Sequence, residues 1–371
     1  NYPYGISDMH KFQWTTQKED LDKWDRFLQS SPRGHYLQVS HWLRSYSKYG
    51  FPFELLLITG SQGEILGGLG VVVSKFGMFK GYTCPCGPIL AIGHEQLLDQ
   101  CIEEFKKRAK EKKAIFCQVN MPLFLDPENS IKAHGLPLAI EDLASLKNAK
   151  AGDKARGISS INGFRSVVIS YDQDGEPYDH VYSNFNKNTK RNIKKANKNH
   201  LQLKFATTPQ KVEETYHLLE LNGATQGYSV RAWADFKDTL LGMMDKGMCM
   251  IPYCEFEGKM LGALIVFEVG ERLTYVSGGT IREDRDLKVG HFLHNEMLRL
   301  SVQKGYRFYD ISVGGSAGVT RFKEGFNGQH VQFHKPRYWV LNPTMFNAYD
   351  KMLPYFKRHK VLVSKVLKLF R

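Results

Sequence analysis

The chain has 371 residues, with 51 Lys and Arg against 38 Asp and Glu and a formal net charge of +13 at pH 7. This length allows two domains that each bury a full hydrophobic core, and the positive charge favours a polyanionic partner: a nucleic acid, a nucleotide-linked substrate or an anionic membrane surface. No apolar stretch approaches the roughly 18 residues that a membrane-spanning helix needs, which argues against an integral membrane protein.

Six cysteines are present, at Cys84, Cys86, Cys101, Cys117, Cys249 and Cys254. No CxxC pair occurs among them, and Cys84-Pro85-Cys86 is too tight for the usual spacing of zinc ligands. Most of them lie inside apolar runs, which is typical of buried, reduced thiols in a cytosolic protein. We therefore expect a cytoplasmic protein with no metal site and no cofactor.

The first half of the chain predicts an alternation of helices and strands. Thr16-Gln17-Lys18-Glu19 is a capping box, and it begins a helix with Leu21, Trp24, Phe27 and Leu28 on one face. The patterns that follow predict a short helix at 40–49, strands at 53–59 and up to residue 73, a hairpin at 75–82, a long helix at 95–112 and a strand at 115–119.

A polar, irregular segment at 126–162 predicts a surface linker or lid. The second half then repeats the alternation. Its patterns predict a strand at 164–169, a helix that Thr208-Pro209 begins, a helix at 232–244, strands at 251–256, 260–269 and 273–277, a helix at 291–304 and a strand from residue 306.

Two sequence matches recur at nearly one spacing. GEILGGL at Gly63 matches GKMLGAL at Gly258 (258 − 63 = 195), and IFCQV at Ile115 matches FYDIS at Phe308 (308 − 115 = 193). Two matches in the same order indicate duplicated halves. We therefore predict an α/β fold of mixed sheets, with two domains at 1–125 and 163–341 that are related by duplication.

The tail at 342–371 has a different character. After Asp350 it contains seven Lys and Arg and no acid, and Leu362, Val366, Leu369 and Phe370 follow a helical spacing. This pattern predicts a short basic amphipathic helix. It is suited either to an anionic membrane surface, as a peripheral contact through residues 351–371, or to packing on the body with its basic face in solvent.

The segment at 306–328 reads YRFYDISVGGSAGVTRFKEGFNG. It begins as a strand that contains Asp310 and breaks into a glycine-rich loop, from which RFKEGFNG follows. Lys323 lies between Phe322 and Phe326, with glycines at 325 and 328 that allow close approach of a ligand. The alternatives are a charge held between two aromatic rings and a hairpin with a solvated lysine.

This segment resembles the "yD...G...FKxGFGG" signature of the Fem-type (FemABX) aminoacyltransferases, which build peptidoglycan cross-bridges; Asn327-Gly328 stands here for the usual "GG". Other blocks resemble the same family in the same order. They are YLQVSHWLRSYSKYG at Tyr36, CPCGPIL at Cys84 (with Cys86 for the usual Arg), FCQVNMP at Phe116, NKNTKRNIKKANKN at Asn186, GYSVRAWADF at Gly227 and LTYVSGGT at Leu273.

The resemblance implies two GNAT-like domains, with the precursor bound by the first and the transfer site near the second. It also implies an aminoacyl-tRNA donor, a UDP-linked or lipid-linked peptidoglycan precursor as acceptor, and a compact monomer without a coiled-coil arm. Aminolysis of an ester needs no enzyme nucleophile, because the acyl group arrives activated. It needs a partner for the oxyanion.

The resemblance also implies roles for single residues, each of which has a purely structural alternative. Lys323 is the expected oxyanion partner, Arg231 binds a substrate phosphate, Tyr275 positions the acceptor, and Asp310 either accepts the amine proton or orients the loop. Phe322 and Phe326 flank the substrate. In the first domain the family places a phosphate-binding lysine a few residues after a tryptophan; Trp42 matches that tryptophan, and the lysine position reads Tyr46, flanked by Arg44 and Lys48 as the candidate substrate-binding cations.

The basic run at 187–198 predicts a surface that binds tRNA phosphates or, alternatively, a solvated charged face. Its cations are Lys187, Lys190, Arg191, Lys194, Lys195 and Lys198.

Two other functions are compatible with the sequence. The first is a GNAT-type acyltransferase that uses acyl-CoA on an envelope polysaccharide or lipid precursor. Such enzymes have a "[QR]xxGx[GA]" loop, which the stretch at 287–292 matches poorly, and the bulky Phe292 is expected to crowd a pyrophosphate. The second is an inactive binding module, which the intact FKEGF at 322–326 disfavours.

Overall fold

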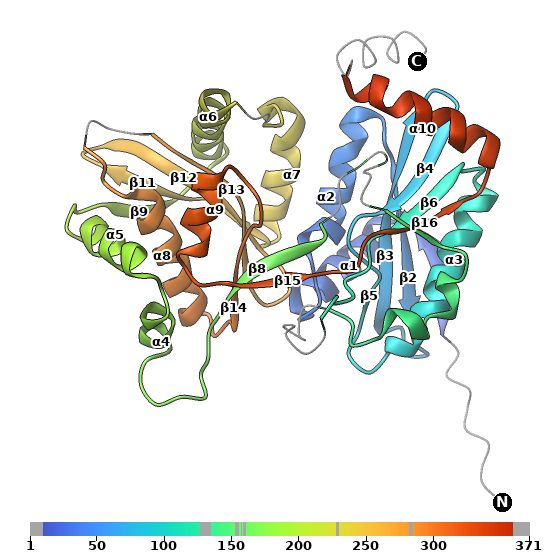
Figure 1. Cartoon of the computed structure of the whole chain (residues 1–371), viewed down its shortest axis with the longest axis horizontal. Helices are drawn as coiled ribbons and strands as arrows, with labels where there is room; N and C mark the ends of the chain where they lie inside the picture. Colours follow the sequence, from blue (N-terminus) through green and yellow to red (C-terminus); the bar gives the residue numbers. More distant parts are fainter. Residues whose placement is uncertain are drawn as a thin grey trace, which may run out of the picture. The chain divides into compact units, whose positions relative to one another are not determined.

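A computed structural model of the chain describes residues 10–126, 135–152, 156, 158, 161–227, 230–281 and 285–358 (Figure 1). The chain forms two compact units. Unit 1 comprises Asn1–Leu28, Arg33–Asn162 and Gln332–Arg371, and unit 2 comprises Gln29–Pro32 and Gly163–Val331.

Unit 1 contains a mixed sheet in the order β1-β2-β3-β4-β6-β16-β7, with β5 paired to β3. Its strands are β1 (Lys11–Thr15), β2 (Phe53–Thr59), β3 (Ile65–Phe76), β4 (Phe79–Cys84), β5 (Ile89–Leu90), β6 (Phe116–Val119), β7 (Lys150–Ala151) and β16 (Arg337–Val340). Its helices are α1 (Lys18–Ser30), α2 (Ser40–Ser45), α3 (Leu98–Glu111) and α10 (Pro343–Arg358), with 3₁₀ turns at Tyr36–Gln38, Tyr46–Tyr49, Glu95–Leu97, Ile140–Asp142 and Ala144–Leu146.

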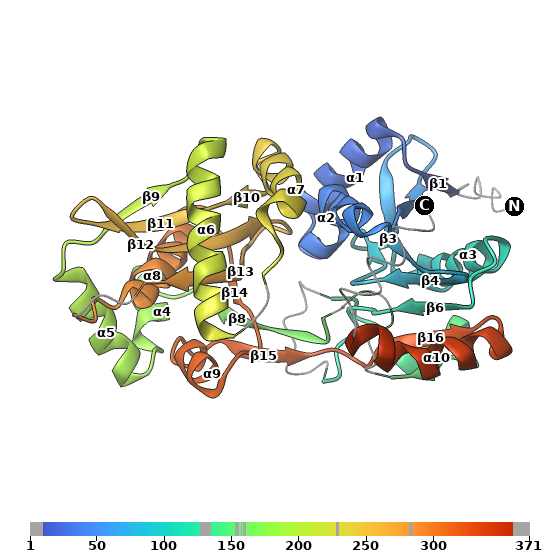
Figure 2. The ribbon, with the colours of Figure 1, turned by 90° about the horizontal axis from the view of Figure 1, so that it is seen from above.

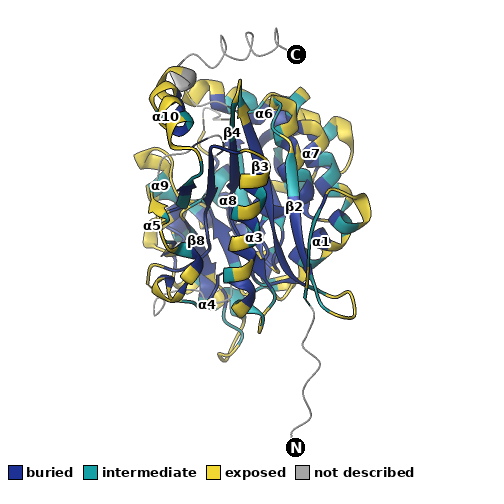
Figure 3. Ribbon diagram, turned by 90° about the vertical axis from the view of Figure 1, so that its right-hand side faces the viewer, coloured by how far each residue is buried: buried dark blue, intermediate teal, exposed yellow. Residues whose placement is uncertain are grey.

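Helix α1 begins slightly differently from the expected capping box. The hydroxyl of Thr15, rather than that of Thr16, accepts a hydrogen bond from the Gln17 amide. The same hydroxyl donates a hydrogen bond to the Asp20 carboxylate. The apolar face predicted for this helix is buried at Leu21, Trp24 and Leu28. In the sheet, β3 and β4 are buried along most of their length, whereas the outer face of α3 is exposed (Figure 3).

Unit 2 contains a second mixed sheet in the order β15-β8-β14-β13-β12-β11-β9, with β10 paired to β12. Its strands are β8 (Gly163–Val168), β9 (Gln202–Phe205), β10 (Cys249–Met250), β11 (Pro252–Phe256), β12 (Lys259–Glu268), β13 (Leu273–Thr280), β14 (Phe308–Ile311) and β15 (Gln329–Gln332). Its helices are α4 (Pro177–Ser183), α5 (Lys187–Asn197), α6 (Pro209–Gln226), α7 (Trp233–Asp245), α8 (Val289–Gln303) and α9 (Ala317–Glu324).

The two sheets repeat one topology, as the sequence matches predicted. Gly63 and Gly258 occupy equivalent turns with positive φ, 80° and 77°, between β2 and β3 and between β11 and β12. In each unit a helix leads into a strand that is parallel to one neighbour: β6 is parallel to β4, and β14 to β13. In unit 2, α6 and α8 cover opposite faces of the sheet (Figure 2).

Unit 1 receives one strand from an unexpected part of the chain. The antiparallel neighbour of β6 is β16, which follows unit 2 in sequence, and the antiparallel neighbour of β14 is β8. Residues 332–341, which the sequence assigned to the second domain, therefore belong to unit 1. Trp339 of β16 is buried in the core of unit 1.

The described part of the tail packs on unit 1. Phe346, Tyr349 and Leu353 of α10 are buried against Ile115 and Phe116, and the rings of Tyr349 and Phe116 stack at 5.7 Å. This contact matches the packing alternative for residues 343–358. The amphipathic positions from residue 362 onward lie outside the described residues.

Two further findings concern expectations from composition. All six cysteines are buried and free, as predicted. Among the described residues, no helix is long and apolar enough to cross a membrane.

Strand β16 follows unit 2 in the sequence but lies in the sheet of unit 1. We therefore expect Trp339 of this strand to stabilise unit 1. Replacing buried Trp339 with Ala should lower the free energy of unfolding by about 3–5 kcal/mol, because it removes a large core side chain. Thermal and urea unfolding of the variant measure this change. The control Met78→Ala, at a residue that is 77% exposed, should stay within about 0.5 kcal/mol. Equal stability of both variants would contradict the role of β16.

Candidate functional site

Lys323 lies on a helix and not in the loop that the sequence predicted. The glycine-rich loop is short, with positive φ at Gly314 (86°) and Gly315 (116°). Ser316 then caps α9 by accepting the amide of Val319, and the helix continues to Glu324. The loop ends early because Ser316 supplies a helix cap, a feature that the surrounding glycines obscured in the sequence.

Lys323 is 5% exposed, and its ammonium donates to Ser312 Oγ at 2.8 Å and to the Gly314 carbonyl at 2.9 Å. The ammonium also lies 5.8 Å from the centre of the Tyr275 ring. Burial lowers the pKa of Lys323 to about 8, and the charge of Arg165 contributes in the same direction. The structure therefore brings together Lys323 and Tyr275 in a partly desolvated position at the end of β14.

Phe322 and Phe326 do not enclose Lys323 as the sequence suggested. One helical turn separates them, so their rings lie 5.5 Å apart on one side, where they contact His291 and His294. Phe326 is fully buried, whereas Phe322 is half-buried. The two rings are consequently part of the packing beneath α9.

The two histidines under this packing are neutral at physiological pH. Burial lowers the pKa of His291 to about 4 and that of His294 to about 3. The Nδ1 of His294 lies 2.8 Å from the Tyr309 hydroxyl, and its ring contacts that of Tyr275 edge-on at 4.6 Å. His294 therefore packs against the ring of Tyr275, which lies beside Lys323, without adding charge.

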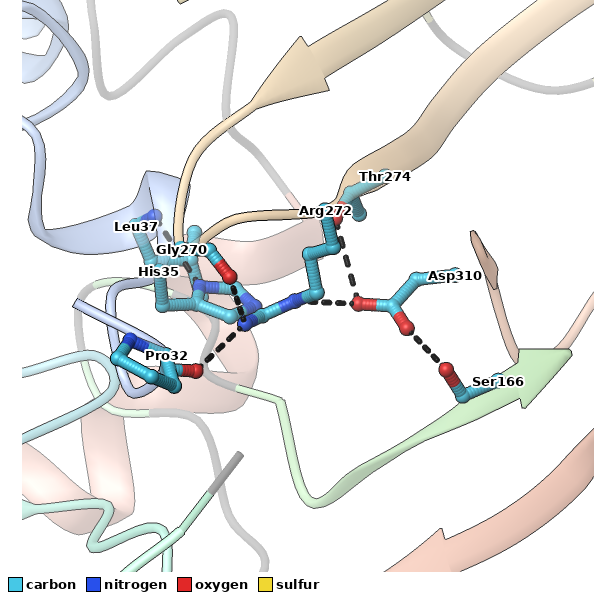
Figure 4. Close-up of polar contacts among 8 residues, drawn as sticks. All are labelled: Pro32, His35, Leu37, Ser166, Gly270, Arg272, Thr274 and Asp310. Carbon is cyan, nitrogen blue, oxygen red and sulfur yellow. Dashed lines mark hydrogen bonds and ion pairs between the residues drawn. The ribbon is translucent and has the colours of Figure 1, made fainter. Parts of the chain in front are cut away.

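Asp310 forms a buried polar cluster of its own (Figure 4). Its carboxylate accepts from Arg272 Nε at 2.8 Å, from Ser166 Oγ at 2.5 Å and from Thr274 Oγ1 at 3.3 Å. Arg272 also donates to the carbonyls of Pro32 and Gly270. Burial raises the pKa of Asp310, and the Arg272 guanidinium opposes this effect.

Asp310 and Lys323 lie on opposite faces of the sheet. Asp310 is opposite Thr274 in the parallel ladder, whereas its neighbour Ile311 is opposite Tyr275, and successive side chains of a strand point to opposite faces. The structure thus does not bring the predicted carboxylate to the predicted lysine. Both oxygens of the Asp310 carboxylate already accept hydrogen bonds within its own cluster.

Arg231 stands just before α7, as expected from the sequence. Its carbonyl accepts from the Tyr216 hydroxyl at 2.8 Å, and its guanidinium lies 5.0 Å from the centre of the Phe236 ring. Glu220 accepts the amide of Trp233 at the start of this helix.

The basic run forms α5, whose N-cap Asn186 accepts the amide of Thr189. Thr189, Ile193 and Ala196 are buried. The six cations lie on the remaining surface: Lys187, Arg191, Lys194, Lys195 and Lys198 are exposed, and half-buried Lys190 donates to the Ser183 carbonyl.

Helix α5 is docked directly on the end of α9. The amide of Asn186 donates to the Gly325 carbonyl at 2.9 Å, and a Cβ at Gly325 would lie 2.1 Å from Thr189 Oγ1. Asn192 is also 3.3 Å from His291. The glycine after Lys323 is therefore required for close packing, and it links the basic surface to the lysine helix.

The remaining predicted residues belong to unit 1. Trp42 is buried on α2 and packs edge-on against Tyr36 at 4.9 Å. Arg44 is exposed and lies 5.8 Å from the centre of the Phe53 ring, and Lys48 is exposed on the following 3₁₀ turn.

A cavity of about 440 Å³ opens at the start of α8, where a GNAT-type enzyme would bind acyl-CoA. It is lined by Leu261, Thr280, Ile281, Arg285, Asp286, Leu287, Lys288, Val289, Gly290, His291 and Phe322. Phe292, expected to crowd a pyrophosphate there, is instead buried in the core of unit 2. The Asp286 carboxylate accepts a hydrogen bond from the Lys288 amide at the N-terminus of α8, so this amide is not available to a ligand in the cavity.

A family sequence profile and several solved structures are similar to this chain. A sequence profile described as the FemAB family matches residues 17–261, which is more than half of the chain. The chain belongs to the FemAB family. No curated protein sequence gives a significant match.

Solved structures show the same fold as this FemAB-family chain. FemX matches with a TM-score of 0.74 and 15% identity, over 91% of this chain and 99% of that one. L-PGS from Bacillus licheniformis matches with a TM-score of 0.54 and 10% identity, over 92% and 97%. The C-terminal domain of a putative lysylphosphatidylglycerol synthetase from Agrobacterium fabrum matches at 0.51 and 10%, over 86% and 90%.

These matches confirm the predicted α/β fold of two domains with mixed sheets, and membership of the FemAB family makes the chain an acyltransferase. The family is one of aminoacyl transfer in peptidoglycan cross-bridge formation.

Sequence reasoning missed four residues of the site in this FemAB-family chain. They are Arg165, Arg272, His294 and Ser312. Each stands in a segment whose pattern indicated only a strand, a helix or a loop, and each becomes a neighbour of Lys323 or Asp310 through strand pairing or helix packing. For Arg165, Arg272 and His294 the signal available in the sequence was a charge or an imidazole within or beside an apolar run, whereas Ser312 gave no such signal.

Because α5 packs closely on the end of α9, we expect alanine to have opposite effects on stability at Gly325 and at Gly318. Gly325→Ala should lower the free energy of unfolding by about 1–3 kcal/mol, because the added Cβ overlaps Thr189. Gly318→Ala, in the same helix but with no heavy atom nearer than 4.0 Å, should raise it by about 0.5–1 kcal/mol. Adding Thr189→Ala to Gly325→Ala should recover part of the loss. Urea unfolding measures all three, and equal effects of the two glycine variants would refute this packing.

Proposed function

We propose that this chain transfers an aminoacyl group from aminoacyl-tRNA to the side-chain amine of a peptidoglycan precursor. The proposal rests above all on Lys323, whose buried ammonium is held by Ser312 and Gly314 beside the ring of Tyr275. A fixed cation in a partly dry site stabilises the negative oxygen that develops during acyl transfer.

In the proposed reaction the acceptor amine attacks the ester carbonyl carbon of the donor. The new C–N bond forms as the carbonyl oxygen becomes an oxyanion, which Lys323 stabilises. Collapse of this intermediate breaks the C–O bond to the ribose, and the ribose oxygen takes up the proton that the amine nitrogen loses. No enzyme nucleophile is needed, since the donor ester is already activated.

Other residues have supporting roles in this proposal. Tyr275, held by His294, positions the acceptor peptide, and the half-buried ring of Phe322 lines the approach. Arg231 binds a substrate phosphate with help from the start of α7. The surface of unit 1 around Trp42, Arg44 and Lys48 binds the precursor. Asp310 holds the sheet together and takes no proton.

The aminoacyl-tRNA donor is supported by α5, whose exposed cations lie on a helix docked against α9. Phosphate contacts of this kind supply most of the sequence-independent affinity for nucleic acid. Acyl-CoA is disfavoured, because the Asp286 carboxylate already accepts the Lys288 amide at the start of α8, where a pyrophosphate would need that donor. The Lys288 ammonium also holds the pKa of Asp286 below its usual range, so the carboxylate stays ionised.

The reaction is proposed for the cytoplasm, where charged tRNA is present. The excess of Lys and Arg from Lys351 onward favours a lipid-linked acceptor over a soluble UDP-linked one, because basic segments are attracted to anionic membrane surfaces.

The oxyanion role predicts how turnover depends on charge at position 323. Lys323→Met should reduce kcat by about 10²–10³-fold, because the oxyanion loses its partner. Wild-type activity should also fall as the pH rises through about 8, where the ammonium is deprotonated. In an active Lys323→Arg variant this alkaline fall should disappear.

Turnover of charged tRNA with purified precursor, measured against pH, tests this role. Lys211, which is half-buried on α6 and pairs with Glu214, provides a control, and Lys211→Met should retain wild-type turnover. Full activity of Lys323→Met would refute the role.

The donor assignment predicts salt-sensitive RNA binding through α5. Replacing Arg191, Lys194 and Lys198 together with Gln should reduce the slope of log affinity for charged tRNA against log salt by about 2–3, because about 0.7–0.9 is lost for each phosphate contact. The same change at Lys107, Lys110 and Lys113, which removes equal charge from an exposed surface of unit 1, should leave the slope unaltered. Titration with acetyl-CoA is the comparison: tight CoA binding without tRNA binding would overturn the donor.

A further inference from the structure

Arg165 is a buried cation with incomplete pairing. It lies on β8 and is 8% exposed, and among the described residues its Nη1 atom has no hydrogen-bond partner. Its ion pair with Glu324 is long, 3.6 Å, and the Glu324 side chain is 58% exposed. Burial of a guanidinium is costly unless an anion compensates it, so this position lacks part of its expected anionic partner.

Arg165 is close in the fold to Lys323. It is opposite Ile311 in the β8–β14 ladder, and Ser312, the next residue, accepts from the Lys323 ammonium. Ile311 is in turn opposite Tyr275 on the neighbouring strand. Arg165, Ile311 and Tyr275 therefore share the face of the sheet on which α9 packs, away from Asp310. The positive charge of Arg165 also lowers the pKa of Lys323.

The end of the FKEGFNG segment makes room for this arginine. A Cβ at Gly328 would lie 2.8 Å from Arg165 Cγ and 3.4 Å from the backbone carbon of Ser166. The aliphatic part of the Arg165 side chain thus occupies the space that the Cβ of any residue other than glycine would need at position 328. The same segment that positions Lys323 also determines where the guanidinium lies.

We propose that Arg165 binds a phosphate group of a substrate beside Lys323. The one carboxylate that pairs with Arg165 is that of the exposed Glu324, and a guanidinium presents paired N–H donors that match two oxygens of a phosphate. The inference rests on the proposed function, in which both substrates contain phosphate. The phosphate is either a phosphodiester near the 3′ end of the donor RNA or the diphosphate of the acceptor precursor.

The test measures binding and not turnover, so that its failure differs from failure of the proposed reaction. The trinucleotide CCA and inorganic pyrophosphate are titrated calorimetrically, at near-physiological salt, into the wild-type protein and into Arg165→Met, Arg165→Lys and Glu324→Gln. Arg165→Met should weaken one of the two ligands by about tenfold or more, as expected for loss of a charge-assisted hydrogen bond. Arg165→Lys should retain part of that affinity, and Glu324→Gln should increase it by removing a competing carboxylate.

The ligand that loses affinity identifies the source of the phosphate. A folded Arg165→Met variant that binds both ligands like the wild-type protein, or a wild-type protein that binds neither, overturns the proposal. Arg165→Met is also expected to move the alkaline fall of activity to higher pH, because removal of a neighbouring cation raises the pKa of Lys323. If Arg165→Met does not fold, Arg165→Gln takes its place in both measurements, with the same criteria.

Discussion

The buried ion pair between Asp310 and Arg272 is the interaction on which the candidate site depends. Its carboxylate also accepts from Ser166 and Thr274, so it joins three adjacent strands at one level of the sheet (Figure 4). Loss of one partner of such a pair typically costs about 3–5 kcal/mol, because the other charge is left uncompensated. Fixing these strands on one face also fixes the residues that alternate onto the other, and it is on that face that α9 presents Lys323.

Close contact, and not backbone freedom, explains the two glycines of FKEGFNG. Gly325 has an ordinary helical conformation, and a side chain there would meet Thr189 at the start of α5. At Gly328 a side chain would meet the stem of Arg165. The segment therefore connects the lysine helix to the basic surface on one side and to the buried arginine on the other. Any change in its packing is transmitted to both charged groups.

The duplication places equivalent residues in the two units, but only unit 2 combines them into a charged site. Arg337 is opposite Val119 in unit 1, as Arg165 is opposite Ile311 in unit 2. In the strand ladders Gln118 and Thr83 of unit 1 correspond to Asp310 and Thr274, which is one residue away from the register of the sequence match. The buried ion pair is thus replaced by neutral groups, and Arg337 instead lines a cavity of about 540 Å³. This divergence agrees with separate tasks for the units.

The sequence by itself determined the family, the two-domain α/β fold, the order of most of the longer helices and strands and the position of the basic helix. These features follow from local periodicity and from motifs of contiguous residues. Only the tertiary structure decided the exchange of β16, because strand pairing across more than 200 residues leaves no local pattern. It also decided that Asp310 faces away from Lys323 and that Arg165 lies near it. Strand register determines which side chains share a face, and the sequence of a single strand does not specify its register with its neighbours.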